Sequence, residues 1–475
     1  MRTRIKWLFA AVIAVNLLYN ASLPLHFDEA YYWIWSKHLD WSYFDHPPMV
    51  AYLIHLFTIG GDSEFFIRLA AVFSTTCAAF LVYLLGRDMF SPRVGELALV
   101  LFLFLPLVHI GFLVITPDSP LFLFWSLVLY LFYQGIFHDR AYCLYGAGIA
   151  GGLALMSKYT AVLLFAALFL FLLFSPYRRV FRSGRLYIAC ALAFLVFLPV
   201  VAWNAGHDWV SFRFQFDHGV AAQKVFNPDT AVEFLGAQAG VFNPLFFLAL
   251  LYYAARYWRR NLSDPRLAFL FWTFAFPLLF FGYHSLFKKS EANWTVPAYI
   301  AGVVLLAYWL DRFRCRRLVA TGLVLSLLII SLVKSPEFFP GLPREMIMKQ
   351  QLQGWDSVFH AGSRYVEPGD VVLSDSYETA SLAWYYLAGR PQVHILTPAR
   401  FSQFDYWRQD LAGRTINRAV FFGSKEQRPE LEKIFMQVEP VDTIYYRDRF
   451  TTREIQVYRC YGYLLQEKTL SAVTQ

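Results

Sequence analysis

The sequence predicts an α-helical polytopic membrane protein that ends in a soluble α/β domain. Charged residues make up only 16% of the 475 residues, against about 25% in ordinary soluble domains. Aromatic residues reach 19%, a surplus that suits the belts formed at membrane interfaces. Apolar stretches recur as far as about residue 335, where the composition becomes that of a water-soluble domain.

The amino-terminal segment begins with the basic stretch Met1 to Lys6 and continues as an apolar run to about Leu25. This order resembles a signal peptide, but no small-residue cleavage site is clear and comparable apolar runs follow. We therefore expect an uncleaved first span.

Eleven stretches approach the roughly 20 apolar residues that are needed to cross about 30 Å of hydrocarbon. The two between 141 and 174 are short, and the break between them falls at Ser157 to Tyr159. The stretches lie at 5–23, 66–86, 95–115, 120–137, 141–157, 160–174, 185–203, 241–258, 266–284, 294–310 and 316–334. The sequence thus predicts about 11 spans.

The arginines indicate the orientation, because loops retained in the cytoplasm collect Lys and Arg. With a cytoplasmic amino terminus, the even-numbered connections face the cytoplasm, and these connections carry the arginine clusters. The net charge of +8 therefore indicates topology, not nucleic-acid binding. We expect a bacterial inner (plasma) membrane protein with a periplasmic carboxyl-terminal domain. The arginines are Arg87, Arg93, Arg140, Arg178, Arg179, Arg182, Arg185, Arg256, Arg259, Arg260, Arg266, Arg312, Arg314, Arg316 and Arg317.

Two domains are predicted: a transmembrane catalytic domain over 1–335, with a first outer loop at 24–65, and a periplasmic α/β domain over 336–475. In the second, 377–387 has the pattern of an amphipathic helix. Strands are predicted at 370–374, 392–396, 419–423, 443–446 and 454–459.

Several classes of protein find no support in the sequence. The five cysteines include no CxxC pair, so a disulfide framework or a cysteine metal site is not expected. There is no GxxxxGK[ST] phosphate loop and no HExxH motif, so an ATP-driven pump and a membrane zincin lack support.

Unusual polar residues gather on the predicted outer side. Asp28 and Glu29 follow the first span, and Asp45-His46 precedes two prolines. Carboxylates at this depth are costly to desolvate, so they pair, bind a cation or do chemistry. A single acid is equally well explained as a solvated loop residue. Two acids and a histidine within eighteen residues, joined by Asp118 from another loop, favour a functional site.

Four motifs carry a family resemblance. They are Phe27-Asp28-Glu29-Ala30-Tyr31-Tyr32, Tyr43-Phe44-Asp45-His46-Pro47-Pro48, Ile115-Thr116-Pro117-Asp118 and Met156-Ser157-Lys158-Tyr159. Their order resembles the bacterial branch of the protein O-mannosyltransferase superfamily. These are type C glycosyltransferases, which include the aminoarabinose and galacturonic acid transferases that act on lipid A. The likeness covers about residues 1–300 and an external carboxyl-terminal domain.

The resemblance implies sugar transfer from a polyprenyl-phosphate donor, with inversion, to a lipid, glycan or protein acceptor. The sugar is a hexose or pentose type. Asp28 is the implied base that takes the acceptor proton, with Asp118 and Glu29 beside it as catalytic residues. The implied groups for the donor phosphate are His46, Lys158, Lys288 and Lys289, and those for the substrate are Asp45, Glu291, Asn293 and Trp294.

Two features of this assignment leave alternatives open. His46 stands where the aminoarabinose branch typically has Lys, so it carries that charge only when protonated. Asp28, Asp45 and His46 form either a divalent-cation site or an acid–base network. Lys158 also fits an ordinary snorkelling lysine, and the turn around Trp294 also fits an interfacial anchor.

A transporter or flippase of a lipid-linked sugar is the alternative function. It would favour ionisable residues near the middle of the spans and internal repeat symmetry. The predicted spans are nearly free of Asp, Glu and Lys, and no internal repeat is evident. A non-catalytic scaffold is disfavoured by the density of motifs in the first outer loop. The expected partners are the lipid-linked donor, its acceptor and membrane lipid, without nucleic acid.

Overall fold

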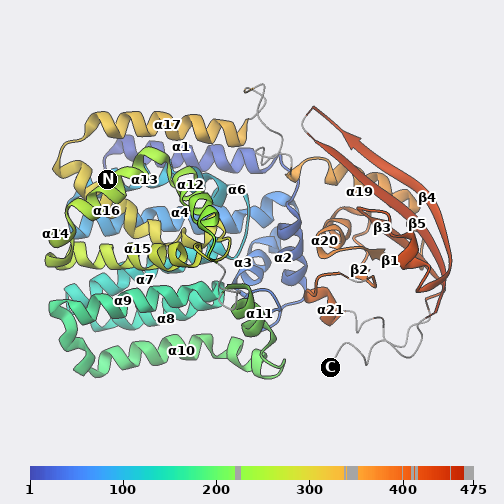
Figure 1. Ribbon diagram of the computed structural model, residues 1–475, viewed down its shortest axis with the longest axis horizontal. Coiled ribbons are helices and arrows are strands. Elements are labelled where there is room, and N and C mark those ends of the chain that lie inside the picture. Colours follow the sequence, from blue (N-terminus) through green and yellow to red (C-terminus); the bar gives the residue numbers. More distant parts are fainter. Residues whose placement is uncertain are drawn as a thin grey trace. The chain divides into compact units, whose positions relative to one another are not determined.

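The computed structural model describes residues 1–219, 226–335, 339, 351–397, 399–407, 411, 416–449 and 451–464. The chain divides into two compact units (Figure 1). The helical unit comprises Met1–Ala21 and Leu39–Ser331, and the sheet unit comprises Ser22–His38 and Leu332–Gln475. The start of the first outer loop therefore folds with the carboxyl-terminal residues.

All of the regular secondary structure described between residues 3 and 334 is helical. Each of the eleven apolar stretches overlaps at least one of them. The α-helices other than α2 are α1 Thr3–Asn20, α3 Met49–Phe57, α4 Glu64–Met89, α5 Pro92–Leu103, α6 Pro106–Leu113, α7 Asp118–Phe137, α8 Ala141–Ser157, α9 Val162–Phe174, α10 Gly184–Ala205, α11 Val210–Gly219, α12 Pro228–Phe242, α13 Pro244–Arg256, α14 Trp258–Ser263, α15 Pro265–His284, α16 Ala298–Arg312 and α17 Arg316–Lys334. Short 3-10 helices are η1 Thr58–Gly60, η2 Tyr159–Ala161, η3 Pro176–Arg182 and η4 Ala292–Thr295.

The prediction of a polytopic membrane protein is confirmed. Among the described residues, five helices are long and apolar enough to cross a membrane singly, namely α4, α7, α10, α15 and α17. The number rises to as many as 8 if each bent helix pair is one span. The count of eleven stays a prediction.

Proline marks each of the three bent pairs. The bends are 64° between α5 and α6, 110° between η2–α9 and η3, and 108° between α12 and α13. In each case the second helix begins with proline: Pro106, Pro176 or Pro244. Proline lacks the N–H that would continue the preceding helix but suits the first position of a new one. The sequence therefore sets where these apolar stretches break.

Glycine allows α8 and α10 to pack closely, and these helices lie side by side in Figure 1. A Cβ atom added at Gly152 would lie 2.6 Å from the Ala193 carbonyl oxygen and 2.6 Å from Val196 Cβ. One turn away, Gly148 meets the backbone of Ala189 in the same manner. Small residues at this spacing let two membrane helices approach backbone to backbone.

The Gly152→Val substitution is expected to lower the free energy of unfolding by at least about 2 kcal/mol, because the added side chain must displace the α10 backbone. Thermal unfolding in detergent measures the effect. Gly236→Val is the matched control, since a Cβ at Gly236 meets nothing within 4 Å. Equal unfolding midpoints for the two variants would contradict the close packing of α8 on α10.

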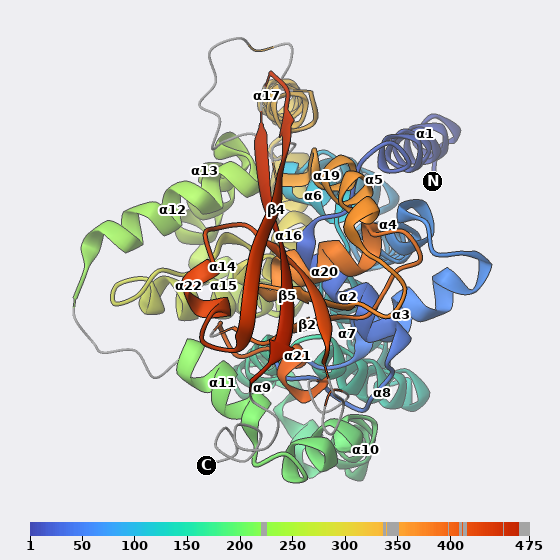
Figure 2. The ribbon, with the colours of Figure 1, turned by 90° about the vertical axis from the view of Figure 1, so that its right-hand side faces the viewer.

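The sheet unit contains one five-stranded sheet among its described residues, in the order β2-β1-β3-β5-β4. Strand β1 is parallel to β2 and β3, whereas β5 is antiparallel to β3 and to β4, with which it forms a long ribbon (Figure 2). The predicted strands and helix are confirmed. The elements are α2 Phe27–Lys37, α19 Trp355–Gly362, η7 Ser363–Tyr365, β1 Val371–Ser374, α20 Tyr377–Tyr386, β2 Val393–Ile395, α21 Gln403–Trp407, β3 Arg418–Gly423, α22 Arg428–Leu431, β4 Phe435–Arg447 and β5 Thr452–Tyr463.

Helix α2 packs against α20 through its aromatic side chains. The Tyr31 hydroxyl accepts a hydrogen bond from the Gln403 backbone N–H at 2.7 Å, and the Trp33 ring meets Tyr385 edge-on at 5.0 Å between centroids. Tyr31 and Trp33 are almost fully buried. Buried aromatic rings contribute large apolar areas and directional contacts. The aromatic stretch of the first outer loop thus fixes α2 to the carboxyl-terminal fold.

Candidate active site

Three predicted site residues meet in the helical unit. Asp118 is the first residue of α7, where the helix dipole favours a carboxylate. Lys158 directly follows α8, and its Nζ lies 2.8 and 3.0 Å from the two Asp118 carboxylate oxygens. Asn293 of η4 donates from Nδ2 to Asp118 Oδ2 at 2.7 Å. Residues far apart in the sequence therefore form one cluster, named here the Asp118 cluster.

Because Lys158 and Asp118 are buried, each stabilises the charge of the other. The Lys158 and Asp118 side chains are 9% and 13% exposed. Removing one partner of a buried ion pair leaves an uncompensated charge and is strongly destabilising. Two of the three ammonium donors face Asp118, and the lysine retains a third. The Lys158 ammonium group is therefore a cation held in a fixed position, with one N–H that Asp118 does not use.

A glutamine supports the turn that carries Asn293. The buried Gln238 of α12 accepts hydrogen bonds at Oε1 from the Thr295 hydroxyl at 2.5 Å and the Tyr299 hydroxyl at 2.7 Å. Its Nε2 donates to the Ala292 carbonyl oxygen at 3.2 Å. No motif in the sequence pointed to Gln238. A lone glutamine inside an apolar helix was the available signal.

Lys289, Glu291 and Trp294, which were also predicted in this turn, have contacts of their own. Lys289 Nζ lies 3.6 Å from Glu233 and 3.8 Å from Glu291, and all three side chains are more than half exposed. Exposed pairs of this kind add little stability. Trp294 is half-buried against Phe281, with 5.5 Å between ring centroids. Lys288 is half-buried, and its backbone N–H donates to the His284 carbonyl oxygen at 3.1 Å.

The loop that carries Asp45 and His46 is held by α10 and α11. The Asp45 carbonyl oxygen accepts from Gln215 Nε2 at 2.6 Å, and Asp45 is only 6% exposed. At the start of this loop, the Asp40 carboxylate accepts from Trp203 Nε1 at 2.9 Å. Asp40, Trp203 and Gln215 were not predicted as supports, because no local pattern links residues so far apart.

Tyr43 adds a buried hydroxyl to the same loop. Its oxygen accepts from the Asp40 backbone N–H at 3.1 Å, and the side chain is fully buried. Burial raises the pKa of the Tyr43 phenol well above its ordinary value. The phenol is therefore neutral at every physiological pH and serves as a fixed hydrogen-bonding group.

Asp28 and Glu29 belong to the sheet unit and have different surroundings. His26 caps α2, since its Nδ1 accepts from the Asp28 backbone N–H at 3.3 Å. Glu29 Oε2 completes the capping box by accepting from the His26 N–H at 2.9 Å, and Glu29 is fully buried. The Asp28 side chain keeps 31% exposure, with its carboxylate 3.6 Å from His26 Nδ1. Asp28 is thus the more accessible acid.

No metal centre is evident in the described part of the chain. There, no three His, Cys, Asp or Glu side chains are arranged to hold a metal ion. The alternative of a divalent-cation site at Asp28, Asp45 and His46 stays a prediction.

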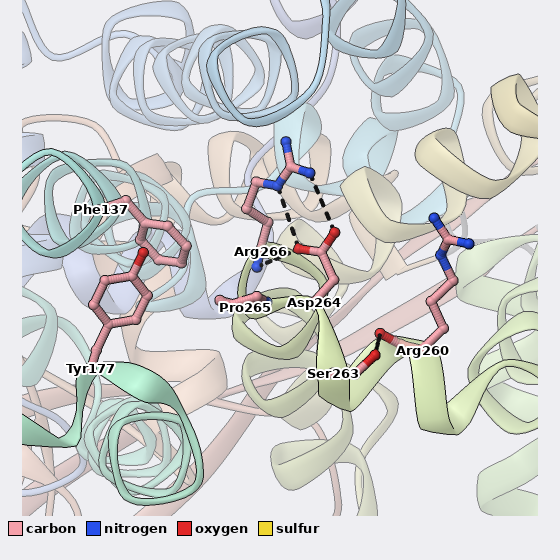
Figure 3. Close-up of a pocket in the computed structure, with 7 residues that line it drawn as sticks. All are labelled: Phe137, Tyr177, Arg260, Ser263, Asp264, Pro265 and Arg266. Carbon is pink, nitrogen blue, oxygen red and sulfur yellow. Dashed lines mark hydrogen bonds and ion pairs between the residues drawn. The ribbon is translucent and has the colours of Figure 1, made fainter.

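A cavity of about 570 Å³ lies at the opposite end of α7 from Asp118 (Figure 3). Helix α7 has 20 residues, so its two ends are ~30 Å apart. Two residues of the cavity, Arg260 and Arg266, belong to the arginine clusters predicted to face the cytoplasm. Arg266 pairs with Asp264 at 3.3 Å. The cavity is lined by Phe137, Tyr177, Arg260, Ser263, Asp264, Pro265 and Arg266.

The Lys158→Met substitution is expected to lower the free energy of unfolding by about 3 kcal/mol, because Asp118 would remain buried without its cation. The double variant Asp118→Asn/Lys158→Met should recover part of that loss, since neither charge is then left alone. Chemical denaturation in mixed micelles measures both values. Additive losses in the double variant would show that the two side chains are not energetically paired.

Known proteins resemble this chain in sequence and in fold. Residues 45–203 match the family model of dolichyl-phosphate-mannose-protein mannosyltransferases. The crystal structure of ArnT from Cupriavidus metallidurans in the apo state superposes with a TM-score of 0.68 at 15% identity, over 96% of this chain and 98% of that chain. An Archaeoglobus fulgidus oligosaccharyltransferase gives a TM-score of 0.53 at 16% identity, over 93% of this chain and 72% of that chain. The chain therefore has an ArnT-like fold, which confirms the fold expected from the resemblance.

One bacterial protein is similar in sequence over most of its length. The chain is 28% identical to the lipid A galacturonosyltransferase RgtD of Rhizobium johnstonii over 394 residues. The match covers 81% of this chain and 82% of that protein. The likeness therefore extends over most of both proteins.

Proposed function

We propose that this protein transfers a sugar from a polyprenyl-phosphate donor to an acceptor at the periplasmic face of a bacterial inner membrane. The Asp118 cluster carries the proposal, because it fixes a buried ammonium group at one end of the membrane helices. The relatives support it: RgtD is named as a lipid A galacturonosyltransferase, and ArnT has been crystallised bound to undecaprenyl phosphate. Lipid A is accordingly the acceptor to test first, and a hexuronic acid the first sugar.

In the proposed reaction, the acceptor oxygen attacks the anomeric carbon on the face opposite the phosphate. The bond between the anomeric carbon and the phosphate oxygen breaks, and its electron pair leaves with the phosphate. Asp28 takes the acceptor proton, which makes the oxygen a better nucleophile. Glu29 acts through the capping box, which holds the first turn of α2 and with it Asp28.

Lys158 stabilises the negative charge that develops on the leaving phosphate. A preorganised cation lowers the barrier most when it need not move during the reaction, and the ion pair with Asp118 provides that restraint. His46, Lys288 and Lys289 supply further positive charge, with His46 contributing only when protonated. Asp45, Glu291, Asn293 and Trp294 bind the sugar, Trp294 by stacking and the others by hydrogen bonds.

The Asp28→Asn substitution is expected to reduce transfer at least about 100-fold, because a general base contributes on that scale. Transfer of labelled sugar to lipid A by purified protein in lipid nanodiscs measures the loss. Asp229→Asn, at an exposed position in the first turn of α12, is the matched control and should keep wild-type activity. Near-normal transfer by Asp28→Asn would remove Asp28 from the mechanism.

Mass spectrometry of envelope glycolipids and glycoproteins tests the reaction in cells. Deletion of the gene should remove one sugar residue from a single class of acceptor, and the mass lost separates a uronic acid from a hexose or a pentose. A flippase would instead move labelled carrier lipid across reconstituted vesicles without forming a glycosidic bond. That result would replace the proposed reaction with transport.

A further inference from the structure

The cavity at the opposite end of α7 from Asp118 lies where three membrane helices pack together (Figure 3). Phe137 is the last residue of α7, Tyr177 belongs to η3 after α9, and residues 260–266 join α14 to α15. The Phe137 ring contacts rings of α9 and α15 at 5.9 and 6.1 Å between centroids. The cavity volume of about 570 Å³ falls within the range of small-molecule sites, about 300–1,000 Å³. The cavity is therefore large enough to hold a ligand.

Arg266 is held in the wall of this cavity by contacts with three residues. Its Nε and Nη2 donate to the two Asp264 carboxylate oxygens at 3.4 and 3.3 Å, and its Nη1 donates to the Met89 carbonyl oxygen at 3.1 Å. The guanidinium also lies 5.4 Å from the centre of the Phe90 ring. Among the described residues, these bonds use three of the five N–H donors of the guanidinium, and the side chain is 46% exposed. Arg266 is therefore a fixed cation that retains two donors for a ligand.

Arg260 adds a second guanidinium to the same cavity. It lies 5.9 Å from the centre of the Trp309 ring, and Arg260 is exposed. Within the described part of the chain, this guanidinium forms no hydrogen bond or ion pair. The lining residues include these two arginines and the acid Asp264, so they carry a net charge of +1. Planar guanidinium groups match the geometry of phosphate, and the cavity thus suits a phosphate that carries one negative charge.

An exposed pair of aromatic rings lies on the two helices that flank the cavity. Phe174 and Trp272 stack with 5.6 Å between ring centroids, and Phe174 is 65% exposed. Phe174 ends α9 three residues before Tyr177. Trp272 lies seven residues after Pro265, or two helical turns, and so on the same face of α15. Exposed rings on membrane helices contact lipid, so the cavity has an apolar surface beside it that a lipid chain can cover.

We propose that this cavity binds the phosphate of an anionic glycerophospholipid of the phosphatidylglycerol class, from the leaflet on the predicted cytoplasmic side. Arg260 and Arg266 donate to the phosphate oxygens, and an acyl chain lies on Phe174 and Trp272. Basic pockets between membrane helices on the cytoplasmic side bind anionic headgroups in this manner. One phosphodiester carries one negative charge, which matches the net charge of the lining residues. The site lies ~30 Å along α7 from Asp118 and is independent of the proposed sugar transfer.

Native mass spectrometry of the full-length protein in detergent, titrated with phosphatidylglycerol, tests the proposal. The wild type should bind one molecule tightly. Arg260→Gln and Arg266→Gln should each weaken that binding at least about tenfold, the scale of one lost hydrogen bond to a charged group. Arg260 is exposed and its guanidinium bonds to no described residue, so Arg260→Gln keeps the test valid should Arg266→Gln impair folding.

Arg259→Gln is the matched control. Arg259 precedes Arg260 in α14, is also exposed, and does not line the cavity. Its guanidinium lies 5.4 Å from the centre of the Trp258 ring, as an arginine on an aromatic face does at Arg260. The variant removes the same charge from the same helix and should bind phosphatidylglycerol within twofold of the wild type. Phosphatidylethanolamine, whose headgroup has no net charge, should bind the wild type at least about tenfold more weakly.

Three results would overturn the proposal. Equal binding of phosphatidylglycerol by the wild type, Arg260→Gln and Arg266→Gln would show that the cavity does not hold the headgroup. Equal weakening by Arg259→Gln would show a general attraction of anionic lipid to the basic surface. Displacement of phosphatidylglycerol by an equal concentration of inorganic phosphate would assign the cavity to a free anion, because the acyl chain would then add nothing to the affinity.

Discussion

The ion pair between Asp118 and Lys158 is the interaction on which the arrangement of the helical unit depends most. A charge is expensive to remove from water, and here each charge is retained only because the other lies beside it. Asn293 adds a third element to the same carboxylate. These contacts require the start of α7, the end of α8 and the turn η4 to lie together. The proline bends and the close glycine contacts occur elsewhere in the unit and do not conflict with that arrangement.

In the sheet unit, a different buried carboxylate, that of Glu29, also fixes the position of a helix. The capping box uses His26 and Glu29 to fix the first turn of α2, while aromatic packing fixes α2 to α20. Asp28 keeps partial exposure within this rigid frame. A rigid element with one accessible acid is what general-base catalysis requires, because misplacement of about 1 Å is costly to the rate.

Local patterns in the sequence predicted most of the elements. Apolar runs gave the helices, alternation and β-branched residues gave the strands of the carboxyl-terminal domain, and the polar motifs identified Asp118, Lys158 and Asn293, which the structure brings together. Contacts between residues far apart in the sequence could not be predicted in this way. The hydrogen bond from Gln403 to Tyr31 of α2, the support of the η4 turn by Gln238, and the bond from Trp203 to Asp40 join residues between 54 and 372 positions apart. No periodicity within a window encodes such pairs.

The proposed reaction requires the first outer loop and the sheet unit to lie on the same side of the membrane. In a variant without the five native cysteines, single cysteines at the exposed positions Trp41, Met436 and Arg178 can be labelled in intact spheroplasts with a membrane-impermeant maleimide. We expect labelling of Trp41→Cys and Met436→Cys, and protection of Arg178→Cys until the membrane is opened. Labelling of Arg178→Cys from outside, or protection of either of the other two, would contradict the account.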